Sequence, residues 1–375
     1  MTMIAPRTVV GPTYTNPDLP GNTTAAYIIP TPETIPFGSL PPALRGMQTH
    51  AVYLDPPQQQ IFNLAGPMKG LQGVRFCTQV TGDMAWPTEQ VLTHSPYQLG
   101  SQIARTNIAE RMFTVGVIIG SQAPPMTEYQ YRMAEDNWWA SQDENNDGWL
   151  GFYTRFSGWR WIPVRPFETL KSPQKLDPTA FGNNASMWDV TWIATRPYFT
   201  KVALYDTFQA IHGGAASPPP GSLLGQAIDQ LIGDVYYWGT IILANRGDLE
   251  SYVEYYVSSP GQAIVQDNNS NRLVPLPQTA MDVGTYMVDT EPGQRTLTAA
   301  NDPQDNLLFD LIRQSQILDF FLSGVANEGL PLQLTWNNRF IYPIPPKTVV
   351  QLTVGHSEPT GVITASVRQR YKRSR

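Results

Sequence analysis

Alternating hydrophobic and polar positions mark much of residues 48–205 as β-strand. Single strands are expected at 73–80, 111–119 and 186–195, and a hairpin is expected at 149–155 and 158–165. With a period of two, one face of the segment 186–195 carries Trp188, Val190, Trp192 and Ala194. Because β-branched and aromatic residues are frequent in all of these runs, strand is favoured over helix. The pattern predicts a first β domain over residues 48–205.

A second block of strand patterns fills residues 236–375. The expected strands lie at 236–243, 251–257, 262–267, 272–276, 284–289, 294–299, 332–336, 339–342, 348–354 and 361–371. Turn residues separate them at short and even intervals, which is typical of a β-sandwich. One longer helix is expected at 303–322, because Asp302-Pro303 fits an N-cap followed by the first helical position.

Two segments lack a strand pattern. Residues 1–47 contain nine prolines and only four charged residues, and proline fixes φ and removes a backbone donor. We interpret this segment as an extended arm, and its apolar runs indicate that it lies on protein, either its own chain or a neighbour. Residues 206–235 contain the Gly- and Pro-rich run 213–221 and a short expected helix at 222–232, so they are interpreted as a linker.

The composition supports a mostly β protein. The 375 residues include 34 prolines, a content that argues against a helical bundle or solenoid. The hydrophobic fraction of 41 % argues against global disorder. We find neither a signal-peptide pattern nor an apolar run long enough to span a membrane, so export and membrane insertion are not expected.

The charge is unevenly distributed between a basic tail and an acidic body. The last eight residues carry five basic side chains and no acid, namely Arg368, Arg370, Lys372, Arg373 and Arg375. Because this tail contributes +5 to a formal net charge of −6, residues 1–367 carry −11. An acidic body repels phosphate, which disfavours nucleic-acid binding as the main activity. The tail is either a solvated terminus or a docking segment for a neighbouring acidic subunit or for nucleic acid.

Motifs for catalysis or cofactor binding are missing from the sequence. Cys77 is the only cysteine, which excludes an intramolecular disulfide and a multi-cysteine metal site. The four histidines are scattered without metal-ligand spacing, and neither a nucleophile elbow nor a phosphate-binding loop occurs. We therefore expect a protein that is not an enzyme and that holds no cofactor and no metal.

The turn at 143–148 resembles the start of a calcium-binding loop. Asp143, Asn145 and Asp147 occupy the first three ligand positions, and Gly148 occupies the position of the turn glycine. Such a loop needs a bidentate glutamate at position twelve, where this chain has Thr154. Since the flanks also have strand rather than helix patterns, a polar turn is favoured over a metal site.

Tryptophans gather around this acidic turn, and two of them are adjacent. Core packing is the default for large aromatic side chains, whereas exposed ones stack on sugars or on partner proteins. Neighbouring residues of a strand point to opposite faces, so one of Trp138 and Trp139 is expected to face outward. This pair and the basic tail are the candidate contacts for a neighbouring subunit or a glycan.

Several runs of the chain resemble a known protein family. They are residues 149–165, 188–198, 244–248, 259–261, 288–297 and 344–348. These turn-and-strand runs are similar to the minor tail proteins of long-tailed siphophages that infect actinobacteria, and to the wider distal tail protein family. The resemblance covers roughly residues 48–375, while the proline-rich arm and the helix expected at 303–322 lie outside it.

The resemblance implies a structural protein of the virion, located at the distal end of the tail. It implies that residues 48–205 form the ring domain, which packs into a six-membered ring, and that residues 236–375 form a galectin-like β-sandwich. Such a ring connects the tail tube to the baseplate hub, and its implied partners are further copies of the chain, the tube protein, and the hub and tape-measure proteins. DNA passes through the lumen without specific binding, and no membrane is involved.

Two alternatives to this structural role remain open on the residues alone. The second domain or the Trp-rich loops could recognise a glycan on the host surface, although fold analogy alone does not establish function. Paired carboxylates could form a glycosidase site, but a sequence does not show whether two of them face each other across a cleft. Of these two, glycan recognition is the stronger alternative.

Overall fold

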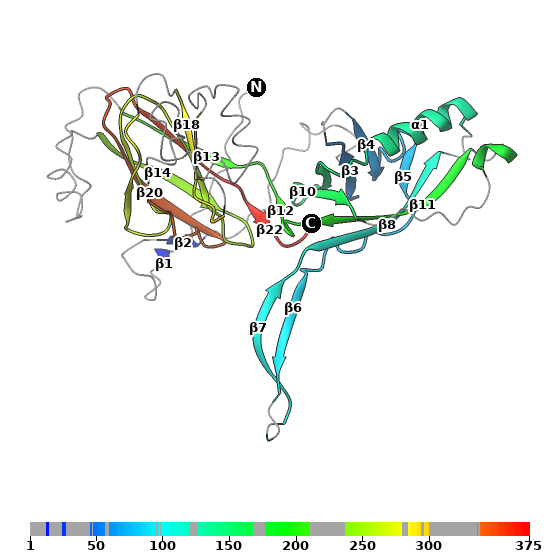
Figure 1. Cartoon of the computed structure of the whole chain (residues 1–375), viewed down its shortest axis with the longest axis horizontal. Coiled ribbons are helices and arrows are strands. Elements are labelled where there is room, and N and C mark those ends of the chain that lie inside the picture. Colours follow the sequence, from blue (N-terminus) through cyan, green and yellow to red (C-terminus); the bar gives the residue numbers. More distant parts are fainter. Residues whose placement is uncertain are drawn as a thin grey trace, which may run out of the picture. The chain divides into compact units, whose positions relative to one another are not determined.

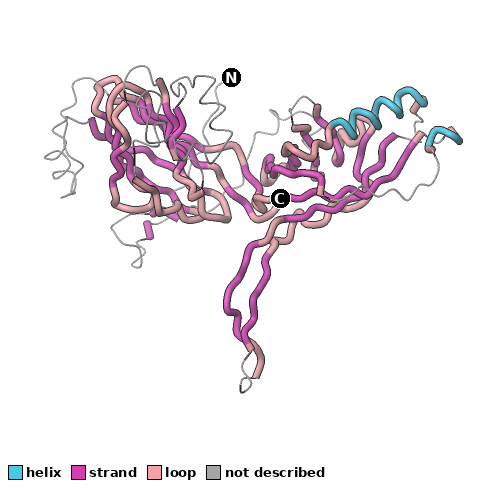
Figure 2. Tube along the Cα trace, viewed as in Figure 1, coloured by secondary structure: helices cyan, strands magenta, loops and turns pink. Residues whose placement is uncertain are grey.

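The chain is described here from a computed structural model. The structure describes residues 48–56, 60–94, 99–120, 126–167, 177–182, 184–210, 237–279, 284–293, 296–299 and 338–375, together with residues 46, 97 and 336 and the short strands 13–14 and 25–27. The helices expected at 222–232 and 303–322, the run 213–221 and most of the arm lie outside these residues. Strands dominate the described part, so the protein is mostly β, as expected (Figure 2).

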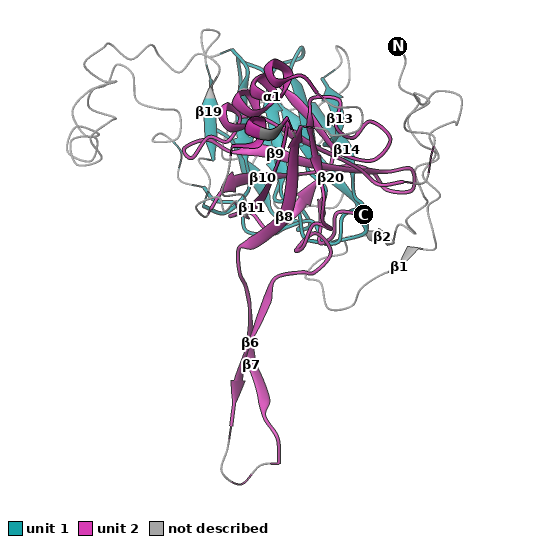
Figure 3. Cartoon of the chain, turned by 90° about the vertical axis from the view of Figure 1, so that its right-hand side faces the viewer, with its two compact units in different colours: residues 1–30, 202–369 teal, residues 31–201, 370–375 magenta. Residues whose placement is uncertain are grey.

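The chain divides into two compact units that are discontinuous in sequence (Figure 3). Unit 1 contains residues 1–30 and 202–369, and unit 2 contains residues 31–201 and 370–375. This division differs from the expected domains at the C-terminus, where residues 370–375 belong to unit 2 and not to the sandwich. It also differs at the linker, because its first residues continue the strand β13 (Leu204–Gln209) of unit 1.

Unit 2 is built on a sheet of nine strands. Its main order is β4-β3-β9-β10-β11-β8-β5, with β12 pairing to β10 and β22 pairing to β12 (Figure 1). These strands are β3 (His50–Leu54), β4 (Ile61–Ala65), β5 (Val74–Phe76), β8 (Arg111–Gly120), β9 (Gly148–Thr154), β10 (Gly158–Pro166), β11 (Ala185–Ala194), β12 (Phe199–Thr200) and β22 (Arg370–Tyr371). The expected hairpin around Phe156-Ser157 is confirmed as β9–β10, and the strand expected at 73–80 is shorter than predicted.

One helix covers the core of unit 2. Helix α1 (Glu128–Ala140) buries Tyr131, Ala134 and Trp138, which recur at helical spacing. Its first turn is closed by a capping box, in which the Thr127 hydroxyl accepts from the backbone N–H of Gln130 and the Gln130 side chain accepts from that of Thr127. The short 3-10 helix η3 (Pro178–Phe181) begins with Asp177 as its N-cap.

The core of unit 2 lies between α1 and one face of the sheet. On β11 the buried residues include Val190, Trp192 and Ala194, so the period-two face predicted for this strand is confirmed. Trp192 stacks on Tyr53 at a centroid distance of 5.6 Å and meets Trp138 edge-on at 6.3 Å. Aromatic burial of this kind accounts for much of the apolar area that stabilises the unit.

Unit 1 is a sandwich of two antiparallel sheets. The first has the order β1-β2-β20-β16-β17 with β14 also pairing to β20, and the second has the order β13-β21-β15-β18-β19. Besides β13, its strands are β1 (Thr13–Tyr14), β2 (Ala25–Tyr27), β14 (Tyr237–Asn245), β15 (Val253–Val257), β16 (Ala263–Gln266), β17 (Leu273–Pro275), β18 (Tyr286–Asp289), β19 (Leu297–Ala299), β20 (Thr348–His356) and β21 (Val362–Val367). The predicted sandwich is therefore present, although 339–342 is not a strand.

Alternation along the strands builds the core of unit 1. From the first sheet it takes Ile241, Leu243, Val350, Leu352 and Val354, and from the second it takes Val253, Tyr255, Val257, Ile363, Ala365 and Val367. Each set follows a period of two, as expected for two sheets that face each other. Within the described residues, no helix is long and apolar enough to cross a membrane.

Candidate assembly surfaces

A two-stranded hairpin extends from unit 2 beyond its main sheet (Figure 3). Strands β6 (Thr88–Thr93) and β7 (Gln102–Ile108) pair only with each other, and β7 leads directly into β8. Almost all of their side chains are exposed. Because an isolated hairpin is at best marginally stable in water, a ribbon without a covering layer is an unusual feature of a monomer.

The two faces of the hairpin differ in polarity. Cross-strand partners share a face, and these pairs place Leu92 with Ile103 and Thr88 with Ile108, so all four lie on the same side. Ile103 and Ile108 share this face because the register shifts between Val91 and Leu92. Leu92 is 47 % exposed, and Ile103 and Ile108 are each 58 % exposed. The opposite face carries the pairs Glu89–Asn107, Val91–Arg105 and Thr93–Gln102. The hairpin is therefore amphipathic, with an apolar face that nothing in the described chain covers.

The outer face of β8 and β11 is partly open, because the side chains of Cys77 and Thr78 cover Gly116 in its middle. The residues that point away from the core pair as Met112–Ile193, Thr114–Thr191, Gly116–Asp189 and Ile118–Met187. Met112 and Met187 are each 41 % exposed, and the hydroxyls of Thr114 and Thr191 lie 3.4 Å apart. This face has apolar residues at both ends and polar residues in the middle.

The structure corrects the prediction for the adjacent tryptophans. Trp138 and Trp139 lie on helix α1 and not on a strand. Trp138 is fully buried against Tyr53, Phe62 and Trp192, which excludes it as a contact for a glycan or a neighbouring subunit. Trp139 is half-buried and packs edge-on against Trp188, with ring centroids 4.9 Å apart.

The acidic turn is held by contacts within the chain. Asp143 accepts from the backbone N–H of Asn145 and from the side chain of Asn146, and these bonds hold the pKa of Asp143 below its usual value. Asp147 forms an ion pair with Arg165 at 2.8 Å. Both carboxylates thus have partners that stabilise the start of β9, and within the described residues no group of three or more His, Cys, Asp or Glu is placed to hold a metal ion.

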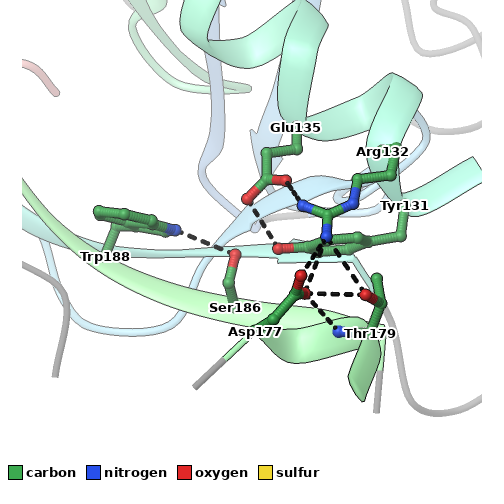
Figure 4. Close-up of polar contacts among 7 residues, drawn as sticks. All are labelled: Tyr131, Arg132, Glu135, Asp177, Thr179, Ser186 and Trp188. Carbon is green, nitrogen blue, oxygen red and sulfur yellow. Dashed lines mark hydrogen bonds and ion pairs between the residues drawn. The ribbon is translucent and has the colours of Figure 1, made fainter. Parts of the chain in front are cut away.

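A surface network joins α1 to η3 (Figure 4). Arg132 pairs with Glu135 at 2.8 Å and with Asp177 at 2.6 Å, and it also donates to the hydroxyl of Thr179. Glu135 accepts from the Tyr131 hydroxyl at 2.8 Å. All of these groups point toward one another, so the network positions the η3 turn rather than presenting charge to a ligand.

Residues 370–375 of the basic tail are part of the fold of unit 2. Strand β22 pairs with β12, and Tyr371 and Ser374 are buried. Arg111, itself buried, donates to the carbonyl oxygen of Lys372 at 2.6 Å, and the Ser374 hydroxyl donates to the Asp83 carboxylate at 3.1 Å. These contacts tie the end of the chain to β8 and to the segment before the hairpin.

The five basic side chains of the tail occupy different environments. Arg368 belongs to unit 1 and pairs with Glu254 at 3.0 Å, whereas the Arg370 guanidinium lies over the ring of Tyr198 at 4.6 Å. Lys372 lies over Trp86 at 5.8 Å, and Arg375 donates to the Thr49 hydroxyl. Arg373 is exposed. Four of the five basic side chains therefore have contacts within their own unit.

One face of the five-stranded sheet in unit 1 combines tyrosines with an ion pair. Cross-strand pairing places Tyr205 opposite Ser366 and Tyr256 opposite Thr364, and Glu254 is the other partner of Ser366. The Tyr256 hydroxyl donates to Glu254, which pairs with Arg368. Tyr205 and Tyr256 are exposed, so this face offers aromatic and charged groups side by side.

The sequence contains a weak signal for the hairpin, which is not among the strands expected above. Residues 88–93 and 102–108 are short β-branched runs, separated by a segment with Ser95-Pro96 and Gly100. This is the pattern of two strands around a turn, but it lacks the strong period of hydrophobic residues that marks a buried face. The sequence has no comparable pattern that marks the outer face of β8–β11 as a contact surface, because the role of that face depends on the molecule that covers it.

Comparisons with known proteins give similarity to solved structures only. No protein-family model and no curated protein matches the sequence. The chain is similar to the Dit (gp 19.1) protein of SPP1, described as a paradigm of the hub adsorption apparatus in phages that infect Gram-positive bacteria. That likeness has 10 % identity and a TM-score of 0.46, and it covers 85 % of this chain and 98 % of that one.

Two chains of the phage P2 baseplate in its activated conformation, one with Ca and one with Sr, are similar in the same way. Their identity is 10 %, and the TM-scores are 0.45 and 0.46. Each covers 87 % of this chain, which in turn covers 100 % and 99 % of those chains. All three likenesses extend over both units of this chain and over nearly the full length of the similar protein.

Proposed function

We propose that this chain is a structural protein of a phage tail tip, whose copies assemble into a ring between the tail tube and the distal hub. The observation that carries this proposal is the uncovered hairpin β6–β7 with its apolar face. The resemblance of residues 149–165 and 188–198 to siphophage tail proteins supports the same role, since these residues form β9, β10 and β11 of the unit that bears the hairpin.

The physical argument begins with the cost of exposed apolar surface. Exposed apolar side chains scattered singly are ordinary, but several on one face of a projecting ribbon mark a protein-interaction site. Covering such a face removes apolar area from water and contributes roughly 25 cal/mol per Å². A protein that assembles gains this free energy of apolar burial only in the oligomer. Its isolated subunit therefore exposes the apolar surface.

The proposed partners follow from the position of such a ring. They are further copies of this chain, the tube protein on one side, and the hub and tape-measure proteins on the other. The role is structural rather than catalytic, and DNA passes through the lumen without specific binding. The excess of acidic side chains in residues 1–367 supports this last point, because negative charge repels the phosphate backbone.

Labelling of phage particles tests the location. Gold-labelled antibodies raised against the purified chain are applied to intact particles and viewed by negative-stain electron microscopy. The proposal expects gold at the distal end of the tail and none on the capsid. Label on capsids or at the head–tail joint would contradict it.

Glycan recognition is a second candidate, and of its two expected locations unit 1 offers the more exposed aromatic face, since Trp138 is buried. The face with Tyr205, Tyr256 and the Glu254–Arg368 ion pair has the aromatic surface and charged hydrogen-bonding groups that sugars bind. Retention on purified host cell-wall polysaccharide is the assay. Tyr256→Ala should weaken retention, and Tyr342→Ala, in the same unit but outside this sheet, should not; equal retention of both variants would contradict this candidate.

A further inference from the structure

We propose that residues 370–375 act as a strap that holds the base of the hairpin β6–β7 and thereby fixes the direction in which the hairpin projects. The base consists of the stretch 83–87 before the hairpin and the stretch 109–111 after it. This inference goes beyond the proposed function, because it concerns a single copy of the chain and requires no assembly. The strap, the base and the hairpin all belong to unit 2.

The hairpin needs support at its base, because pairing within the ribbon does not fix its direction. Strands β6 and β7 form a two-stranded sheet of their own, and the backbone N–H of Ala109 closes it by donating to the carbonyl oxygen of Pro87 at 3.1 Å. The β7 leg continues almost directly into β8. The β6 leg is bridged to β8 at Thr81, but residues 82–87 form no strand. Since a two-stranded hairpin is at best marginally stable, this leg depends on other contacts.

Ser374 of the strap binds Asp83 of the base through two hydrogen bonds. Its backbone N–H donates to the carbonyl oxygen of Asp83 at 3.1 Å, and its hydroxyl donates to the Asp83 carboxylate at 3.1 Å. Both residues are buried. Hydrogen bonds to a charged group are stronger than those between neutral groups, and burial protects them from competing water. The two bonds therefore fix the start of the β6 leg.

Arg111 joins the strap to both legs of the hairpin. It is the first residue of β8 and is itself buried. Its guanidinium donates to the carbonyl oxygen of Lys372 in the strap at 2.6 Å and to that of Asp83 in the base at 3.3 Å. The ring of Trp86 lies 5.6 Å from this guanidinium and 5.8 Å from the Lys372 ammonium. The strap thus contacts the base at three residues from both legs.

The strap is in turn fixed to the main sheet of unit 2. Strand β22 pairs with β12, and the Arg160 guanidinium of β10 lies over the Tyr371 ring at 4.1 Å. Arg160 also donates to the carbonyl oxygen of Arg373 at 2.8 Å. The strap therefore connects the sheet to the base of the hairpin. A projecting element that is held in one direction before it meets a partner loses less conformational freedom on binding.

Spin-label distances test whether the strap fixes the hairpin. In the full-length chain with Cys77→Ser, labels are attached at Glu89→Cys on β6 and Tyr129→Cys on α1, which are both exposed positions of unit 2. Pulsed electron paramagnetic resonance measures the distribution of distances between them, below any concentration at which copies associate. Ser374→Glu places a second carboxylate against Asp83, and it should widen the distribution at least about twofold.

The matched control is Arg373→Glu. It introduces the same side chain at the neighbouring position of the strap, where the native side chain is exposed. The distance distribution of this variant should stay as narrow as that of the wild type. A distribution for Ser374→Glu that is no wider than that of the control would overturn the inference.

Hydrogen exchange of the full-length chain is a second measurement, made with a milder variant. Ser374→Ala removes the hydroxyl that donates to Asp83 and keeps the backbone N–H. We expect amide exchange about tenfold faster over residues 84–93 and 102–110, because the hairpin then opens locally more often, and unchanged exchange in β9 and β10. Equal acceleration in both regions would show that the tail stabilises unit 2 as a whole, and would overturn the role of a strap.

Discussion

Arg111 is the buried charge that fixes the C-terminus to unit 2. Its guanidinium donates to the carbonyl oxygens of Asp83 and Lys372 and lies against the rings of Trp86 and Phe199. Burial lowers its pKa to about 10, partly offset by the nearby Asp83 carboxylate, so the side chain stays charged at neutral pH. A charge in this position is stabilising only while its hydrogen-bonding partners remain in place.

Replacement of this side chain should loosen the tail. Arg111→Met keeps the aliphatic packing but leaves two carbonyl oxygens without their donor, so we expect the free energy of unfolding of unit 2 to fall by about 2 kcal/mol. Eight of the ten tryptophans lie in this unit, so tryptophan fluorescence in a urea titration reports the loss. Arg105→Met on the exposed hairpin is the control, and an equal effect of both variants would contradict the role given to Arg111.

His356 is a buried histidine of unit 1 that is held neutral. Its Nδ1 accepts from the backbone N–H of Glu358 at 3.0 Å, and its Nε2 lies 3.1 Å from the carbonyl oxygen of Ser258. Burial lowers the pKa of His356, and it also lowers the pKa of His50 in unit 2. Below pH 6.5 the unfolded chain therefore binds protons that the folded chain does not.

The free energy of unfolding should consequently decrease as the pH falls below 6.5 toward the lowered pKa of these groups. Above pH 6.5 their contribution should be fully present. We expect a lower urea midpoint at pH 5.5 than at pH 7.5, followed by circular dichroism. In His356→Gln this difference should shrink. A difference that is unchanged in His356→Gln would show that His356 is not one of the groups responsible.

Among the elements, α1 is held by a cap and by a narrow buried stripe. Its sequence is mostly polar, and only Tyr131, Ala134 and Trp138 are buried. This explains why the hydrophobic pattern did not predict the helix: three buried positions in thirteen residues give a weak period, and the adjacent tryptophans favoured a strand. By contrast, the second half of β11 alternates regularly, because one of its faces packs on the core.

The capping box of α1 gives a prediction at this scale. Thr127→Ala removes the hydroxyl that accepts from Gln130, and should lower the free energy of unfolding by about 1 kcal/mol. Thr127→Ser keeps a hydroxyl at the same place and should retain most of the stability. Urea titration of the two variants measures the difference, and a loss of the same size in both would show that the cap does not matter.

At the scale of the molecule, the sequence predicted two β domains, but it did not predict how the chain is shared between them. Local alternation shows where strands lie, whereas the pairing of β22 with β12 joins residues far apart in sequence. For the same reason, the sequence did not predict that the basic tail contacts Arg111 and Asp83 of its own chain. Surfaces for assembly are harder still to predict from the sequence, because their partners are other molecules.

Assembly is the central claim, and images of the purified full-length protein test it most directly. If copies of the chain assemble into the proposed ring, negative-stain electron microscopy should show closed rings with a central opening, with six copies expected from the resemblance to tail proteins. A field of single, unassociated molecules at every concentration tried would contradict the account.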